Sequence, residues 1–173
     1  DQWHLRNNGQ QGALHGADVS AVTAWDITIG DPSVVIAIID DGIDLSHEDF
    51  GAGKLRDGRD YVDGDWDPSA EASHWDPGWD SHGNACAGVA AALGDNGIGV
   101  SGACPDCSIL PIRLIGGFTS DAMEADAFQF AADEGAWVLS NSWGPPEDGG
   151  WYPIPSATAN AIDYALTSGR GGQ

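Results

Sequence analysis

Two residues whose side chains can share a proton stand at the ends of apolar segments. Asp40 ends the run SVVIAIID (33–40), and His82 begins HGNACAGVAAALG (82–94), which is rich in alanine and glycine. The small residues can pack tightly and hold the imidazole still, and Gly83 lets backbone approach closely beside the ring. A carboxylate that accepts a hydrogen bond from Nδ1–H fixes the tautomer of an imidazole and stabilises its protonated form. The alternative is that Asp40 caps a turn and His82 is a structural histidine at an interface.

The cysteines and the other histidines offer further candidates. Cys86 follows His82 by four residues, but a small buried hydrophobic residue in an alanine-rich helix is a better interpretation than a thiol nucleophile. Cys104 and Cys107 in CPDC can form a small disulfide, and three cysteines are too few for a tetrathiolate zinc site. A metal hydrolase has no support from an HExxH-type spacing. Its candidate ligands would be His47, His74 and His82.

Length and charge restrict the possible partners. The 173 residues suffice for one domain with a real core. The net charge of −21, from 27 acidic and 6 basic side chains, argues against nucleic acid and anionic lipid as partners but permits calcium or cationic substrates. No apolar run reaches the roughly 18 residues of a membrane-spanning helix. We therefore predict neither nucleic-acid binding nor a membrane span.

Strand and helix patterns alternate along the chain. Buried strands are predicted at 33–40, 108–115 and 136–144. The predicted helices are a short one at 16–25, one that starts at His82, one at 120–135 and one at 156–169. Residues 51–81 have no period and predict a long loop. This alternation predicts an α/β fold with a mainly parallel sheet and helices on both faces, and ligands gather at the carboxyl ends of the strands in such folds.

Local signals refine this prediction. Asp121 can cap the helix at 120–135, Glu124 can complete a capping box, and Gly135 can end it. Pro111 predicts a local irregularity in the second long strand. Asp40 and the segment SNSWG (140–144) both fall at carboxyl ends of predicted strands.

Three segments in order carry a resemblance to a known family. VVIAIIDDGIDLSHEDF, SHGNACAGVAAALGDNGIGVSGACP and LSNSWGP resemble the corresponding segments of the subtilisin-like serine proteases. The doublet DDG, the cysteine after the histidine and SWGP are similar to the kexin and furin branch of that family. The likeness spans nearly the whole chain. It implies that residues 1–173 are the N-terminal portion of one subtilisin-like catalytic domain, whose fold is incomplete without its C-terminal part.

The resemblance implies an Asp–His–Ser endopeptidase in which Asp40 and His82 are two members of the triad. In the family the serine lies in a GTS context and the oxyanion-hole asparagine in an AGN turn, and neither occurs here. Both are therefore expected in a C-terminal remainder of the same protease, either in a longer precursor or as a nicked partner chain, without which this chain is inactive. The resemblance also implies that the protein is secreted to the extracellular space or the periplasm. Its implied partners are peptide or protein substrates and a propeptide or inhibitor.

The resemblance also implies calcium as a cofactor. LGDNGIGV (93–100) resembles a calcium loop of the family, and hard oxygen ligands of this kind suit the ion. The implied ligands are the carbonyls of Leu93, Ile98 and Val100, the side chain of Asn96, and the carboxylates of Asp49 and Asp1. RDYVDGDWDP (59–68) resembles a second calcium loop, with Asp60, Asp65 and Asp67 as ligands. The alternatives are a glycine-rich turn without an ion for the first segment and a solvated acidic loop for the second.

Substrate residues are implied around the third predicted strand. Ser142, Trp143 and Gly144 resemble the segment that pairs with an extended substrate. Acids that select basic side chains match Asp41, Glu124 and either Glu147 or Asp148. The sequence therefore predicts a serine endopeptidase that cleaves after basic residues. The alternative is a noncatalytic calcium-binding or interaction module on the same scaffold.

Overall fold

A parallel sheet forms the centre of the molecule. The structure, a computed structural model, describes residues 2–71, 82–145 and 150–172. Over these residues the sheet contains four strands in the order β2-β3-β1-β4, and every pair is parallel. The strands are β1 (Val35–Asp40), β2 (Arg59–Asp60), β3 (Ser108–Arg113) and β4 (Ala136–Ser140). The predicted parallel α/β sheet is thus confirmed.

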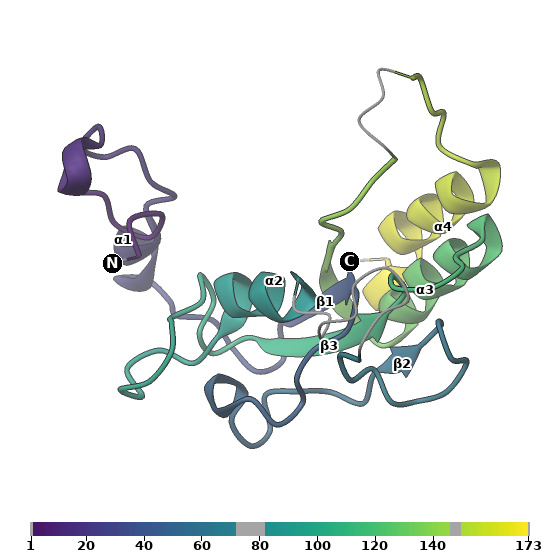
Figure 1. Ribbon diagram of the computed structural model, residues 1–173, viewed down its shortest axis with the longest axis horizontal. Coiled ribbons are helices and arrows are strands. Elements are labelled where there is room, and N and C mark those ends of the chain that lie inside the picture. The colour runs from purple at the N-terminus through teal and green to yellow at the C-terminus, as the bar shows by residue number, and fades with distance from the viewer. Residues whose placement is uncertain (1, 72–81, 146–149, 173) are drawn as a thin grey trace.

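Helices lie on both faces of the sheet (Figure 1). The α-helices are α1 (Ala21–Trp25), α2 (His82–Ala91), α3 (Asp121–Asp133) and α4 (Ser156–Thr167), and the 3₁₀ turns are η1 (Gln10–Gly12), η2 (Glu48–Phe50) and η3 (Gly169–Gly171). One core joins alternate residues of β1, such as Ala37 and Ile39, to Phe128 of α3 and Ala161 of α4. The other joins Ile36 and Ile38 to Ala87 and Ala91 of α2. The two-residue alternation of a strand sends these side chains to opposite faces.

The continuous apolar character of β1 and β3 follows from their central place. All six residues of each strand are buried, and Val35 to Asp40 pair in register with Ser108 to Arg113. Pro111 keeps its place in this ladder, opposite Ile38. On the other side of β3 the pairing is interrupted, because a bridge joins Leu55 to Ile109 and the β2 ladder resumes only at Ile112. The missing N–H of proline falls at this gap, so the predicted irregularity lies beside β3.

Two helix predictions need correction at their starts. The helix expected at 16–25 covers only 21–25, because Gly16 and Ser20 have positive φ and the Asp18 carboxylate accepts hydrogen bonds from the backbone N–H of Asn7 and of Ser20, both at 2.7 Å. The helix expected at 120–135 begins one residue after its cap. Ser120, and not Asp121, caps α3 by accepting a hydrogen bond from Met123 N–H at 3.3 Å.

This change of cap also removes the predicted capping box. With Ser120 as N-cap, the third helical position is Met123, so Glu124 is one residue too far along to reach back. Gly135 follows the helix with φ of 79°, in the left-handed region that favours glycine. The predicted end of the helix is thus confirmed.

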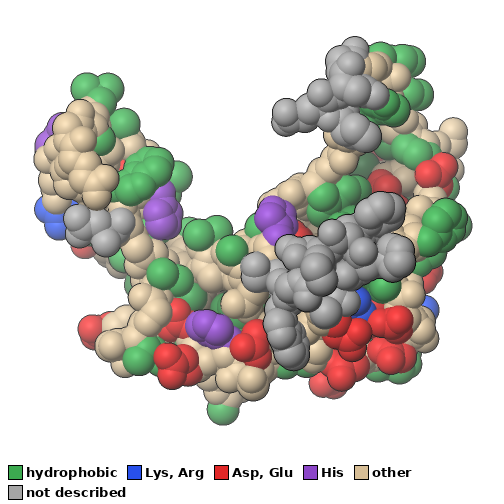
Figure 2. Space-filling view, viewed as in Figure 1, with side chains coloured by type: hydrophobic (Ala, Val, Ile, Leu, Met, Phe, Trp, Pro, Cys, Tyr) green, Lys and Arg blue, Asp and Glu red, His purple; other side chains and the backbone are tan. Residues whose placement is uncertain are grey.

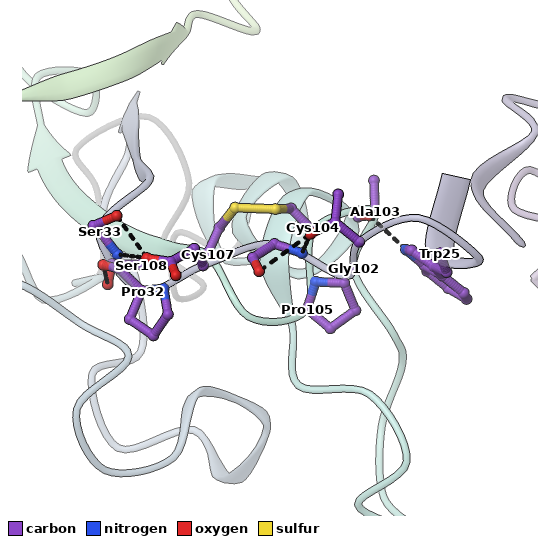
Figure 3. The surroundings of a disulfide bond; sticks show 12 residues. Trp25, Pro32, Ser33, Gly102, Ala103, Cys104, Pro105, Cys107 and Ser108 are labelled. Carbon is purple, nitrogen blue, oxygen red and sulfur yellow. Dashed lines mark hydrogen bonds between the residues drawn. A yellow bond between two sulfur atoms is a disulfide. The ribbon is translucent and has the colours of Figure 1, made fainter. Parts of the chain in front are cut away.

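The predicted disulfide forms between Cys104 and Cys107, and Cys86 is a free cysteine. Figure 3 shows the disulfide and the hydrogen bonds that lie on either side of it. On one side Trp25 Nε1 donates to the Ala103 carbonyl at 2.9 Å, and on the other Ser108 Oγ donates to the Pro32 carbonyl at 2.7 Å. The bridge therefore braces the loop that contacts Trp25 on one side and leads into β3 on the other.

The overall shape is open on one side. In Figure 1 the N-terminal segment with α1 stands apart from the sheet at the left, and the chain after β4 rises at the right. Figure 2 shows the concavity between these parts. No helix in the described part of the chain is both long and apolar enough to cross a membrane.

Candidate functional site

The predicted pair of proton-sharing residues meets where β1 ends and α2 begins. His82 Nδ1 lies 2.7 Å from Asp40 Oδ1. Asp40 is 2% exposed, whereas the His82 side chain is 57% exposed. Among the described residues nothing forms a hydrogen bond with the other ring nitrogen, Nε2. The aspartate is therefore a buried orienting group, and Nε2 can reach a reactant.

The backbone around the pair is held by Asp41 and Gly83. Asp41 Oδ2 accepts from His82 N–H at 3.1 Å, and Asp41 Oδ1 accepts from Gly83 N–H at 2.6 Å. A carboxylate at a helix start satisfies free N–H groups and interacts favourably with the helix dipole. A Cβ on Gly83 would collide with the Gly42 carbonyl and lie 2.9 Å from the Cβ of Asp40. Glycine at 83 is thus what lets α2 approach β1 closely enough for the pair to form.

The electrostatics of the pair suit a general base. The hydrogen bond to Asp40 raises the pKa of His82 above its ordinary value of 6.5, and burial opposes this rise. An aspartate on Nδ1 keeps the proton of the neutral ring at that nitrogen and leaves a lone pair on Nε2. The arrangement can therefore accept a proton at Nε2 and stabilise the imidazolium that results.

Cys86 is closer to this pair than the sequence predicts. Its Sγ lies 3.9 Å from His82 Nδ1, because positions four apart share a face of a helix. The residue packs against the core beside α2 but is only half-buried, so it is less buried than the sequence predicts. Burial raises the pKa of its thiol, and Ser142 is among the groups that interact with it. A thiol with a raised pKa is a poor nucleophile at neutral pH.

The segment after β4 lies beside the same edge of the sheet. Trp143 Nε1 donates to the carbonyl of Ile39 at 2.7 Å, which fixes this segment next to the end of β1. Trp143, Gly144 and Glu124 of α3 all line one cavity of about 960 Å³. The structure thus brings together three of the predicted substrate residues. Asp41 has a different place, since both of its carboxylate oxygens hold the start of α2.

The first predicted calcium loop folds around one buried carboxylate. Asp49 is 2% exposed, and its Oδ1 accepts from Asn96 Nδ2 at 2.8 Å while its Oδ2 accepts from Val100 N–H at 2.7 Å. No basic side chain in the described ranges forms an ion pair with it. A buried carboxylate beside an amide side chain and a glycine-rich backbone is a donor set that fits a hard cation. Leu93 and Ile98 flank the same loop, and their backbone N–H groups donate to the Asp49 carbonyl and to Asn96 Oδ1.

The acids of the second predicted loop are not gathered around a cation. Arg113 Nη1 lies 2.7 Å from Asp60 Oδ2 and 2.6 Å from Asp63 Oδ2, and Asp60 Oδ1 accepts backbone hydrogen bonds. Asp65 and Asp67 are exposed, and each accepts a backbone hydrogen bond two residues further on. In the described part of the chain these carboxylates do not converge within 4.8 Å. Among the acids of this loop, Arg113 therefore pairs with Asp60 and Asp63 only, and these acids as they stand do not form a calcium site.

Some residues near these sites were missed by sequence reasoning. Gln2 donates to the Ser101 carbonyl at 2.7 Å and accepts from Ser101 N–H at 2.8 Å, so its amide lies against the end of the first calcium loop. Asp121 lines the cavity with Glu124, although the sequence suggested a capping role for it. The places of Gln2 and Asp121 depend on contacts with residues distant in the sequence, so the sequence alone does not predict them.

The remaining predicted residues lie outside the described residues or, in the case of His47, apart from His82. Asp1, Glu147, Asp148 and His74 lie outside the described residues. His47 accepts from Asp49 N–H at 3.2 Å and does not join His82 in a metal-ligating group within the described ranges. The metal-hydrolase interpretation has no support from this arrangement.

Comparison with known proteins agrees with the fold and with the family resemblance in the sequence. The family profile described as "Subtilase family" matches residues 31–172. A calcium-dependent protease of Trichormus variabilis is 40% identical over 185 residues, which cover 99% of this chain and 26% of that protein. Neuroendocrine convertase 2 of Drosophila melanogaster is 34% identical over 173 residues, which cover 99% of this chain and 26% of that protein.

A solved structure shares the fold. The Aeromonas sobria serine protease, determined in complex with a chaperone, superposes with a TM-score of 0.74 at 22% identity, over 95% of this chain and 28% of that one. The chain spans about a quarter of the length of the curated relatives it matches.

Proposed function

The chain belongs to the subtilase family, and from this premise we propose that it supplies the aspartate and the histidine of a serine endopeptidase. The observation that carries the proposal is the 2.7 Å contact between the buried Asp40 and the exposed His82. A serine from a segment outside these 173 residues completes the triad. The family alone would also be compatible with a scaffold that had lost its activity, but the contact between Asp40 and His82 supports an active site.

The proposed mechanism divides the work between the two residues. Asp40 holds the proton of His82 at Nδ1, so that Nε2 takes the proton of the serine hydroxyl as it attacks the scissile carbonyl. The imidazolium is stabilised by Asp40 and then donates its proton to the leaving amine. Water hydrolyses the acyl-enzyme by the same route in reverse. Asp41 and Gly83 keep the ring in position throughout.

The segment with the serine is proposed to pack against the exposed apolar surface beyond β4. This strand lies at the edge of the sheet, and its Trp137 and Val138 are each 51% exposed. Leu166 on α4 is 75% exposed. An open edge strand beside apolar side chains is a surface that a further strand and helix would cover. This packing would complete the core of the same catalytic domain.

A preference for basic residues before the scissile bond is proposed from the acids near the site. Glu124 is half-buried and lines the cavity together with Trp143 and Gly144. Because Ser120 caps α3, the Glu124 carboxylate has no capping role and can interact with a cationic side chain. The name of the Drosophila relative, a convertase, accords with the kexin-like branch. Asp41 is a weaker candidate, since its carboxylate holds the start of α2.

We further propose that the first loop binds calcium and that the protein works in an oxidising compartment. Asp49, Asn96 and carbonyls of the loop at 93–100 would hold the ion, whose contribution would be to stabilise the folded loop. The Cys104–Cys107 disulfide favours secretion, because such bonds persist outside the reducing cytosol.

Labelling with a fluorophosphonate probe tests the proposal. The probe is applied to the protein together with its serine-bearing segment, with calcium present. We expect one serine to be labelled, and labelling to be lost in His82→Ala and retained in His15→Ala, which changes an exposed histidine of the N-terminal segment. A folded, calcium-loaded sample that takes up no label would instead indicate a noncatalytic module.

Substrate preference is tested separately. A peptide library should show cleavage after arginine or lysine, and Glu124→Gln should reduce that preference. Cleavage without any preference for basic residues would refute the specificity and leave the peptidase itself in place.

A further inference from the structure

Asn96 is followed by a glycine in the loop at 93–100, and both residues are exposed. We propose that Asn96 is a site of spontaneous deamidation, and that the carboxylate it leaves beside Asp49 destabilises the loop when no cation is bound. The reaction stands on the chemistry of the chain itself. Its dependence on calcium rests on the proposed function.

The reaction needs only the chain and water. Hydroxide takes the proton of the Gly97 backbone nitrogen, which attacks Asn96 Cγ. A bond forms between this nitrogen and Cγ, and the bond from Cγ to Nδ2 breaks. The Nδ2 group takes a proton from water and leaves as ammonia, so the product is a succinimide ring. Water then opens the ring at either carbonyl and yields aspartate or isoaspartate at position 96.

Gly97 offers an attacking nitrogen that is neither hindered nor engaged. Its φ is 78°, in the region that favours glycine, and a Cβ at this position would meet nothing within 4 Å. In the part of the chain that the structure describes, its N–H donates no hydrogen bond. Removal of its proton therefore breaks no internal hydrogen bond, and no side chain blocks the approach to Asn96.

The amide of Asn96 is polarised toward attack. Its Oδ1 accepts a hydrogen bond from Ile98 N–H at 3.2 Å, and a donor there stabilises the negative charge that develops on this oxygen during the attack. Its Nδ2 donates to Asp49 Oδ1 at 2.8 Å, and this bond must break before ammonia leaves. Deamidation is therefore expected from states in which the loop opens locally.

A second Asn–Gly pair in the chain lacks these features. Asn8 is exposed and precedes Gly9, which also has a positive φ, 82°. Gly9 N–H, however, donates to Asn7 Oδ1 at 2.9 Å, so the attacking nitrogen is engaged. Among the described residues no N–H donates to the side-chain oxygen of Asn8. Asn96 should therefore deamidate before Asn8.

Deamidation turns one attractive contact of Asp49 into a repulsive one. A carboxylate at position 96 has no proton to donate, and two carboxylates in contact repel each other. Asp49 is 2% exposed, so water screens this repulsion poorly. Isoaspartate also lengthens the backbone by one methylene, which displaces Val100, whose N–H donates to Asp49 Oδ2 at 2.7 Å. Both products therefore weaken the loop in its ion-free state.

Peptide mapping by mass spectrometry tests the site. The protein with its serine-bearing segment is treated with a fluorophosphonate to prevent self-cleavage, and is then kept in mildly alkaline buffer with chelator or with calcium. In chelator we expect the mass gain of NH₂ replaced by OH to appear in the Asn96 peptide before the Asn8 peptide. Equal rates for the two asparagines, or no gain at Asn96, would overturn the proposal.

The calcium arm separates this proposal from the proposed function. Calcium at about 100 times its Kd should slow the reaction at Asn96 by up to about 100-fold, because it depletes the ion-free loop by that factor. The reaction at Asn8 should not change. If Asn96 reacts equally fast in calcium and in chelator, the deamidation site stands and the proposed calcium binding at this loop fails.

Thermal melting in chelator tests the consequence for stability. Asn96→Asp, which reproduces the charge of one product, should melt at a lower temperature than the unaltered protein. Asn8→Asp is the matched control and should keep its Tm, because Asn8 is exposed and no hydrogen bond of its side chain is present among the described residues. Equal Tm values for the two variants would contradict the proposed repulsion at Asp49.

Discussion

His82 Nδ1 lies 2.7 Å from Asp40 Oδ1 although 42 residues separate the two in the chain. The contact arises because β1 ends at Asp40 and α2 begins at His82, with α2 packed on the face of the sheet that Ile38 lines. Neighbouring elements of a parallel sheet meet at the carboxyl ends of its strands. The contact shows that the two side chains interact, which the alternative of a turn-capping aspartate and a separate structural histidine does not predict.

Asp40→Asn should abolish most of the proposed activity while it preserves the shape of the site. An amide can donate to Nδ1 and so favours the wrong tautomer of His82, with the proton on Nε2. We expect kcat to fall by about 10⁴-fold, as such a change does in triad enzymes. Peptide hydrolysis by the protein with its serine-bearing segment measures this. Asp44→Asn, an exposed acid on the loop after β1, is the control, and an equal loss there would contradict the assignment.

The raised pKa of His82 gives activity and stability opposite dependences on pH. Its hydrogen bond to Asp40 raises the pKa above 6.5, so its contribution to stability is fully present below 6.5 and is lost as the pH rises through the raised value. Activity requires the neutral ring and should increase over that same range. NMR titration of the histidine C–H signals should show a pKa above 6.5 that falls in Asp40→Asn. An unchanged pKa of His82 in Asp40→Asn would show that the hydrogen bond to Asp40 does not raise it.

Two glycines of α2 should respond oppositely to alanine. A Cβ at Gly83 would collide with the Gly42 carbonyl, so Gly83→Ala should force α2 away from β1 and destabilise the fold by about 1–3 kcal/mol. At Gly88 the nearest atom to a Cβ is Val100 Cγ2 at 3.7 Å, so Gly88→Ala should stabilise the helix by up to about 1 kcal/mol. Denaturant unfolding measures both. Similar effects of the two changes would refute the close approach at Gly83.

The sequence predicts the parts of this molecule that depend on local pattern. The continuous β-branched run of β1 predicts a strand buried on both faces, and the spacing of CPDC permits its disulfide. Asp40 and His82 were found because each stands at the boundary of an element and because the motifs around them follow a known order. Alternation of elements then suffices to predict a parallel sheet.

Features that depend on long-range contacts could not be predicted. Nothing near Asp60 in the sequence indicates that Arg113, 53 residues later, neutralises it through the register of β3 beside β2. The roles of Asp41 and Ser120 were missed for a related reason, since a cap is assigned only when the first helical residue is known to within one position. The side chains of Cys86 and Gln2 likewise acquire partners only in the folded chain.

Calcium removal should lower the thermal stability of the protein through the first loop. An ion that binds only the folded state stabilises it by about 2.7 kcal/mol when its free concentration is 100 times Kd. Asp49→Asn should remove the difference in Tm between calcium and chelator, because the buried carboxylate is the charged ligand of that loop. Asp65→Asn, in the exposed acidic loop, should keep the difference. Melting that is identical with and without chelator would refute the calcium site.

Loss of the buried arginine should cost far more stability than loss of an exposed one. Arg113 is 3% exposed at the side chain and lies 2.7 Å from Asp60, itself 2% exposed, so Arg113→Met would leave a buried carboxylate without a cation. Breaking such a pair typically destabilises by about 3–5 kcal/mol. Arg56 is exposed and donates a hydrogen bond to the Pro32 carbonyl at 2.9 Å, so Arg56→Met should cost less than about 1 kcal/mol. Unfolding in urea gives both values. Rescue of Arg113→Met by added calcium would show instead that a cation can replace the guanidinium, and that Asp60 and its neighbours can hold one once the arginine is removed.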